Sequence, residues 1–185
     1  MERKLMKENL DEITEEEMQN FELVNNMILT ISRYDVFQSM ENNNQSYGMP
    51  EVLSSKFKYL AFMDWVNYLG NLLKHVEKYY RNKFDLPELL DKHSIYEMPG
   101  EVDEKKEQIN KGKSWDNFEY ITVRDRIIKL RNRVNHGNLD HTQLYRAHFI
   151  LLFENRDLNI FEGLVGQFTL VQNKLIKNAV NYLKE

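Results

Sequence analysis

Apolar residues recur every three or four positions along most of this sequence, which is the spacing of one face of an α-helix. The longest such run extends from Pro50 to about Lys83 and is typical of a helix that packs against another helix. Its apolar positions are Tyr59, Phe62, Val66, Leu69, Leu73, Val76 and Tyr80, with Trp65, Leu72 and Tyr79 beside them. We expect this aromatic-rich stripe to form the core of the protein rather than a cofactor site.

An earlier helix is predicted from about Thr14 to about Met40. Thr14 and Glu17 have the spacing of a capping box, and the acidic residues that follow Thr14 suit the first turn of a helix. The apolar residues that recur at helical spacing are Phe21, Val24, Ile28 and Ile31. Residues 41–50, which are rich in Asn and contain Gly48 and Pro50, predict a loop before the next helix.

The second half of the chain contains further helical patterns after a long charged segment. Residues 87–91 predict a short turn, and residues 93–113 a charged loop insertion that is either a simple excursion or a lid over a site. Three helices are then expected: from Ser114 or Asp116 to Asn135, from Asp140 or Thr142 to about Asn155, and from Asn159 to the C-terminus. The last carries an apolar stripe at Leu164, Phe168, Val171, Leu175 and Tyr182, and its Gly163 and Gly166 predict close helix packing.

These patterns predict an all-α fold, a single-domain bundle of four to five helices spanning residues 1–185. The length of 185 residues and the 42% of apolar residues suit one domain with a full core. The sequence has no Cys, no apolar run long enough to span a bilayer and no signal-peptide pattern at its start, so we expect a cytoplasmic protein without disulfides. The net charge of −4 argues against a general nucleic-acid coat but not against a local site.

Basic residues are concentrated near the end of the third long helix. Between Thr122 and His136 there are five cations, Arg124, Arg126, Lys129, Arg131 and Arg133, and one anion, Asp125. They form either a solvated helix face, with the arginines paired to nearby acids, or an anion-binding site. Arg124 and Arg131 are expected on the borders between the two faces of this helix.

A helical wheel divides this helix into two faces with apolar content. Val123, Ile127, Leu130 and Val134 form a narrow stripe that is expected to face the core. Asp125, Asn132 and His136 lie on the opposite side, together with Phe118 and Ile121 and with Ile128 on the flank. A second subunit is one natural cover for this other face, and another segment of the same chain is the alternative.

His136 and the residues before it carry the only chemistry that the pattern suggests. His136 lies off the core stripe, close to a helix end, with Asn132 one turn earlier. It is either a functional imidazole beside an anion or a polar residue at the C-terminal end of a helix dipole. No pair of His residues has zinc-protease spacing and no Cys assists, so no metal site is predicted.

The segment from Arg131 to His136, Arg-Asn-x-x-x-His, resembles the signature of the HEPN superfamily. That signature is an Arg, four to six residues and a His, commonly with Asn directly after the Arg. Its place late in a helix of an all-α chain of this length is also similar to the family. The resemblance covers the motif closely and the remaining fold loosely, and it points to a stand-alone prokaryotic member.

The resemblance implies a metal-independent endoribonuclease, a toxin or defence RNase, that acts as a homodimer with two motifs facing each other. Arg131, Asn132 and His136 would be its catalytic residues, and no cofactor would be needed. The 2′-hydroxyl of RNA would attack the adjacent phosphate, Arg131 would stabilise the charge on it and His136 would move the proton. Positions expected to hold the substrate are Arg124, Lys129, Arg133 and Asn135.

The family also contains proteins of other kinds, and these leave alternatives open. Some members with this motif bind nucleotides, RNA or proteins without catalysis, so a non-catalytic interaction module is the alternative function. A few members act as toxins paired with a small nucleotidyltransferase antitoxin, which is therefore a possible partner. Cleavage of RNA without metal, and its loss on replacement of His136, would separate the enzyme from the module.

Overall fold

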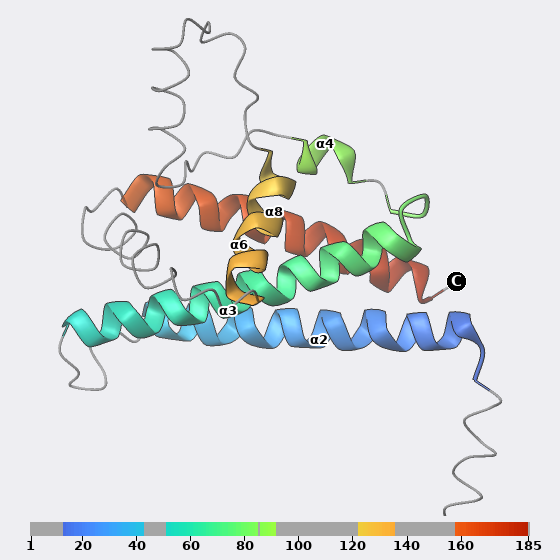
Figure 1. Ribbon diagram of the computed structural model, residues 1–185, viewed down its shortest axis with the longest axis horizontal. Helices are drawn as coiled ribbons and strands as arrows, with labels where there is room; N and C mark the ends of the chain where they lie inside the picture. The colour runs from blue at the N-terminus through green and yellow to red at the C-terminus, as the bar shows by residue number, and fades with distance from the viewer. Residues whose placement is uncertain (1–12, 43–50, 85, 92–121, 136–157, 185) are drawn as a thin grey trace, which may run out of the picture.

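The computed structural model describes residues 13–42, 51–84, 86–91, 122–135 and 158–184. They form the helices α2 (Glu15–Asn42), α3 (Glu51–Tyr79), α4 (Pro87–Leu90), α6 (Val123–Asn135) and α8 (Leu158–Tyr182). The described residues contain no β-strand, so the predicted all-α fold is confirmed (Figure 1). The charged loop predicted at 93–113 and the helix predicted between Asp140 and Asn155 lie outside the described residues.

Two long antiparallel helices, α2 and α3, lie side by side and form the base of the molecule (Figure 1). The shorter helix α6 crosses α3, and α8 contacts α2, α3, α4 and α6. Helix α3 is therefore the central element, because both α2 and α6 pack extensively against it. No helix in the described part of the chain is long and apolar enough to cross a membrane.

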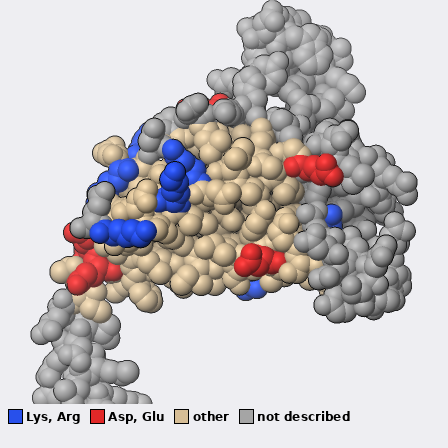
Figure 2. Space-filling model, turned by 180° about the vertical axis from the view of Figure 1, so that it is seen from behind, with Lys and Arg blue, Asp and Glu red and all other residues tan. Residues whose placement is uncertain are grey.

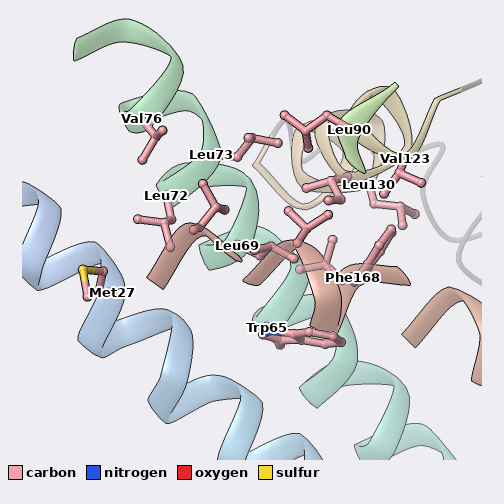
Figure 3. Close-up of a cluster of buried hydrophobic side chains, with 14 of the residues drawn as sticks. Met27, Trp65, Leu69, Leu72, Leu73, Val76, Leu90, Val123, Leu130 and Phe168 are labelled. Carbon is pink, nitrogen blue, oxygen red and sulfur yellow. The ribbon is translucent and has the colours of Figure 1, made fainter. Parts of the chain in front are cut away.

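The apolar stripe predicted for α3 forms the core. Trp65 is fully buried, and its ring contacts those of Tyr34, Phe37, Phe62 and Phe168. The other buried positions are Tyr59, Val66, Leu69, Leu72, Leu73, Val76 and Tyr80. Side chains from α2, α6 and α8 join this stripe in one cluster (Figure 3). The prediction that these aromatic residues serve the core is confirmed.

The buried indole nitrogen of Trp65 has a polar partner. Its Nε1 donates a hydrogen bond to Oε1 of Gln172 in α8, and the two atoms are 2.6 Å apart. Gln172 itself is only 3% exposed. A buried N–H or amide oxygen without a partner would cost stability, so this bond lets two polar groups lie inside the core. It also fixes the position of α8 along α3.

Helix α2 buries a different stripe from the one that its spacing indicated. Its buried side chains are Leu23, Met27, Thr30 and Phe37. The indicated stripe lies on the outside, with exposed fractions of 70% for Phe21, 60% for Ile28 and 37% for both Val24 and Ile31. The two stripes are about 120° apart on a helical wheel, and both are largely apolar. Both stripes have helical spacing, but only the one that packs against Trp65 and its neighbours is buried.

The exposed stripe of α2, defined by Phe21, Val24, Ile28 and Ile31, is a run of apolar side chains on the surface. Contiguous exposed apolar residues often mark a contact surface. Seen from behind, much of the molecule is uncharged, with Lys and Arg side chains gathered toward one edge (Figure 2). The apolar stripe of α2 is therefore a candidate contact surface.

The start of α2 is a capping box, as predicted. The backbone N–H of Thr14 donates to Oε2 of Glu17 at 2.8 Å, and the backbone N–H of Glu17 donates to Oγ1 of Thr14 at 3.2 Å. These reciprocal bonds satisfy N–H groups that a helix start would otherwise leave without acceptors. Hydrogen bonds from Thr14 hold the pKa of the Glu17 carboxyl below its usual value.

Replacing Thr14 with alanine is expected to destabilise the fold by about 1 kcal/mol, because the cap is lost. Thr14→Ser, which keeps the hydroxyl, should stay close to the wild type in urea denaturation. Because folding lowers the pKa of Glu17, its contribution is present above pH 4.5 and is lost as the pH falls through the folded pKa. The difference between wild type and Thr14→Ala should therefore shrink in acid. A constant difference at all pH values would contradict this account.

Candidate functional site around Arg131

Helix α6 begins at a cap that sequence reasoning placed too early. The hydroxyl Oγ1 of Thr122 accepts a hydrogen bond from the backbone N–H of Asp125 at 3.1 Å, which is the contact of an N-cap residue. The helix therefore begins at Val123, and the prediction of one helix from Ser114 or Asp116 is wrong. Its end at Asn135 is as predicted. Arg131 and Asn132 of the predicted motif lie near the C-terminal end of this helix.

The core face of α6 is the predicted one. Val123, Ile127 and Leu130 are at most 1% exposed, and they pack into the cluster formed around α3. Ile128, which was expected on the flank of the opposite face, is half-buried and packs against the same core. Asp125 and Asn132 on the other face are also half-buried. The side chain of Val134 lies outside the described part of the structure.

Two amide side chains orient Arg131: that of Asn71 in α3 and that of its own neighbour Asn132 in α6. Its Nε donates to Oδ1 of Asn71 at 2.7 Å, and one of its Nη atoms donates to Oδ1 of Asn132 at 3.0 Å. A guanidinium carries five N–H donors in a rigid fork, and these two contacts fix its plane. The half-buried Arg131 is therefore oriented before any ligand arrives. Asn132, the residue after Arg131 in the predicted motif, is thus in direct contact with its guanidinium.

Gly70 makes this arrangement possible. A Cβ atom at position 70 would lie 2.7 Å from Cβ, 2.9 Å from Cγ and 3.0 Å from Cδ of Arg131, which is closer than real Cβ contacts. The absent side chain lets the stem of Arg131 lie directly on the α3 backbone. Sequence reasoning missed Gly70 and its neighbour Asn71. The available signal was a lone glycine inside the longest uninterrupted helical pattern of the chain.

The predicted close packing at Gly166 is wrong. A Cβ at that position would meet no atom within 4 Å. The residue lies on an exposed part of α8, and the buried stripe of that helix passes through Leu164, Phe168 and Val171. A glycine inside a helical pattern thus marks either a close contact or an open surface, and the sequence alone does not separate the two.

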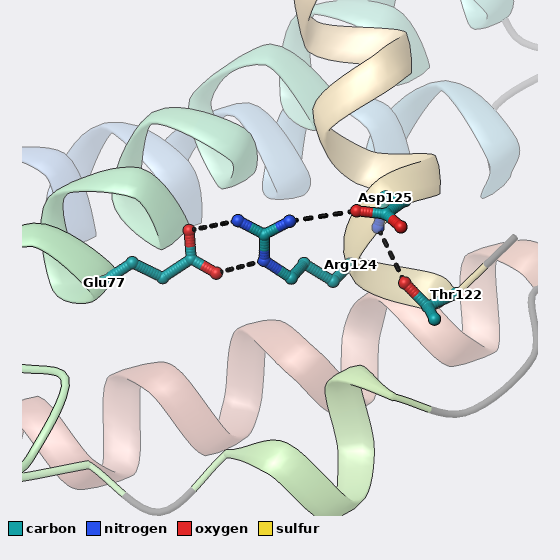
Figure 4. A network of polar contacts seen from close by, with 4 residues as sticks. All are labelled: Glu77, Thr122, Arg124 and Asp125. Carbon is teal, nitrogen blue, oxygen red and sulfur yellow. Dashed lines mark hydrogen bonds and ion pairs between the residues drawn. The ribbon is translucent and has the colours of Figure 1, made fainter.

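A second arginine, Arg124, joins α6 to α3 near the start of α6. It donates from Nε to Oε1 of Glu77 at 2.5 Å and from a terminal nitrogen to Oε2 at 2.9 Å, and its other terminal nitrogen donates to Asp125 at 2.9 Å (Figure 4). The hydrogen bonds to Glu77 raise the pKa of Arg124 above its usual value. Such a bidentate pair is geometrically specific, so it fixes the crossing point of the two helices.

From the sequence alone, the carboxylates of Asp64 and Glu77 on the long second helix could line a cleft of the bundle or face solvent, and facing solvent is the better interpretation. Instead, the Glu77 side chain is 25% exposed and forms this bidentate pair. Asp64 does remain 45% exposed, with its Oδ2 3.2 Å from Nε of Arg33. The expectation is therefore wrong for Glu77, because α6 crosses α3 at that position and brings Arg124 to it.

The structure brings some of the predicted site residues together. Arg131 and Asn132 are in contact, and Arg124 lies two turns earlier on the same side of α6, about 10 Å along the axis. Lys129 is exposed. The side chains of Arg133 and Asn135, and all of His136, lie outside the described residues.

The basic cluster is not simply a solvated face. Arg126, one of its five cations, is only 1% exposed, and both Arg124 and Arg131 are half-buried against α3. The same helix thus uses arginine stems and guanidinium groups as packing material. In the described part of the chain, no three His, Asp or Glu side chains are grouped so that they could hold a metal ion.

The chain was compared with family models, with curated proteins and with solved structures, and none of them matches it.

Proposed function

We propose that this protein is a metal-independent endoribonuclease of the HEPN type that cleaves RNA with Arg131, Asn132 and His136. The observation that carries the proposal is the orientation of Arg131 by Asn132, its neighbour in the motif, and by Asn71 of α3. A catalytic guanidinium has to be positioned before the reaction, because stabilisation of developing charge depends on groups that need no reorganisation. An arginine that served only as a surface cation would not need two amide oxygens to fix its plane.

The chemistry follows from the side chains of the motif. The 2′-hydroxyl of a ribose attacks the adjacent phosphorus, the bond from phosphorus to the 5′-oxygen breaks, and a cyclic 2′,3′-phosphate remains. The imidazole of His136 takes the hydroxyl proton, and a proton is returned to the leaving 5′-oxygen. Arg131 stabilises the negative charge on the non-bridging oxygens. The need for a 2′-hydroxyl restricts the substrate to RNA.

A homodimer belongs to this proposal, because the family resemblance places two motifs opposite each other. The exposed stripe of α2 supports self-association in general, since Phe21 is 70% and Ile28 is 60% exposed.

The test is cleavage of a fluorescently labelled RNA in the presence of EDTA. Wild type is expected to give products that end in a cyclic phosphate, and His136→Ala to slow cleavage by about 10²–10⁴-fold. Arg131→Lys should also lose most of the activity, because lysine cannot reproduce the two fixed contacts and the fork geometry. Lys177→Ala, an exposed cation on α8, is the matched control and should cleave like the wild type.

Two outcomes would contradict the proposal. One is an intact, folded wild-type protein that leaves RNAs of varied sequence uncut. The other is a His136→Ala protein that cleaves as fast as the wild type, which would assign the activity to a contaminant. Circular dichroism of each variant separates loss of chemistry from loss of fold. RNA binding without cleavage would favour a non-catalytic interaction module instead.

A further inference from the structure

A small cavity opens between α3, α4 and α6, beside the pair formed by Arg124 and Glu77. Its volume is about 220 Å³. The apolar part of its lining consists of Val76, Phe84, Leu86 and Leu90, all of which are at most 6% exposed. The polar part consists of Glu77, Arg81, Asp91 and Arg124. The arrangement of an apolar floor with a few convergent polar groups is that of a ligand site.

The charges of the lining indicate a neutral ligand. Two guanidinium groups, those of Arg81 and Arg124, are balanced by the two carboxylates of Glu77 and Asp91. Arg124 and Glu77 are bound to each other in a bidentate pair, whereas Arg81 and Asp91 are exposed at the rim. An anion would meet two carboxylates and a cation two guanidinium groups, so neither sign of charge is favoured. A neutral ring that both donates and accepts hydrogen bonds suits the lining better.

The size of the cavity restricts the range of possible ligands further. Sites for drug-sized ligands usually measure about 300–1,000 Å³, so this one holds a single ring system. Among nucleobases, guanine offers N–H donors on one edge and the acceptors O6 and N7 on another. An exposed carboxylate such as Asp91 accepts from the N–H donors, and an exposed guanidinium such as Arg81 donates to O6 and N7. The apolar floor covers the faces of the ring.

The position of the cavity relative to Arg131 suggests that its ligand is part of the RNA substrate. Arg124, which lines the cavity, and Arg131 lie on the same side of α6, two turns and about 10 Å apart along the axis. The cavity and Arg131 therefore lie along one side of the same helix. We propose that this cavity binds a guanine base of the RNA whose phosphate is held at Arg131. The inference deepens the proposed function and rests on it for the identity of the RNA substrate.

The experiment measures binding of free nucleosides to the full-length protein by NMR chemical-shift perturbation. Guanosine is expected to bind more tightly than adenosine, cytidine or uridine. Arg81→Gln should weaken guanosine binding about tenfold or more, because a hydrogen bond from a charged donor is lost. Leu90→Phe, which reduces the free volume, should also weaken it. Lys177→Gln on the exposed side of α8 is the control and should not change the affinity.

The outcomes separate this inference from the proposed function. No guanosine binding, equal binding of all four nucleosides, or guanosine affinity unchanged in both Arg81→Gln and Leu90→Phe overturns the guanine site. If such a protein still cleaves RNA, the proposed function survives without it. The converse result is a protein that binds guanosine through Arg81 and yet cuts no RNA. That result would support the guanine site and contradict the proposed ribonuclease activity. In an active enzyme, Arg81→Gln is expected to abolish preference for sites next to guanine while cleavage itself continues.

Discussion

Replacing Gly70 with alanine is expected to lower RNA cleavage by about 100-fold, the order of loss that follows a misplacement of about 1 Å at a reacting group. The new Cβ would lie 2.7 Å from Cβ of Arg131, an atom next to the backbone that cannot rotate away. Helix α6 must therefore shift, and the guanidinium leaves the position in which Asn71 and Asn132 hold it. Cleavage assays on the purified variant measure this effect.

The same substitution has a predictable effect on stability. Overpacking costs about 1–3 kcal/mol, and alanine in a helix interior returns about 1 kcal/mol relative to glycine. The net change should therefore be a loss of up to about 2 kcal/mol. Gly166→Ala is the matched control, because position 166 has open space and should gain up to about 1 kcal/mol. Stabilisation by both substitutions, with unchanged cleavage, would show that α6 does not press on Gly70.

Replacing Trp65 with alanine is expected to destabilise the protein by about 3–5 kcal/mol, the usual cost of removing a large buried aromatic side chain. Trp65 is fully buried and contacts four other aromatic rings, which come from α2, α3 and α8. Because these contacts join three helices, loss of the Trp65 side chain weakens the packing of the whole core. Urea denaturation followed by circular dichroism measures the change.

The hydrogen bond between Trp65 and Gln172 can be tested separately with a more conservative substitution. Trp65→Phe keeps an aromatic ring but leaves the buried Oε1 of Gln172 without its donor. The cost of Trp65→Phe should therefore be smaller in a Gln172→Met background than in the wild type, by about 1 kcal/mol or more. Equal costs in both backgrounds would mean that water replaces the lost donor. A loss of less than about 1 kcal/mol for Trp65→Ala would contradict the central place of this residue.

Much of the fold could be predicted from spacing. The predicted apolar stripes of α3 and α8 are buried except for Tyr79 and Tyr182, which are partly buried, because each helix has one dominant apolar face. The capping box at Thr14 was also predictable, since its bonds are local in sequence. The buried face of helix α2 could not be predicted, because the helix carries two apolar stripes and only one of them is buried. Local pattern cannot rank two such faces when the choice depends on what packs against them.

In the candidate site, too, some contacts could be predicted from the sequence and others could not. The pairing of Arg131 with Asn132 is between neighbours in the sequence and agrees with the motif. The contributions of Gly70 and Asn71 come from a helix sixty residues earlier. The same holds for Glu77, which meets Arg124 only because α6 crosses α3. Contacts between residues so far apart in the sequence cannot be predicted from the local pattern of a single sequence.

By itself, the sequence determined that this is an all-helical protein and which residues of α3 are buried, and it pointed to one short motif near the end of α6 as the candidate for chemistry. These properties follow from periodicity and from neighbouring residues, which act over a few turns of helix. Only the tertiary structure decided which face of α2 is exposed, where α6 crosses α3, and how Arg131 is oriented. The physical reason is that an arginine gains a fixed direction only from groups packed around it, and here Gly70 and Asn71 come from another helix.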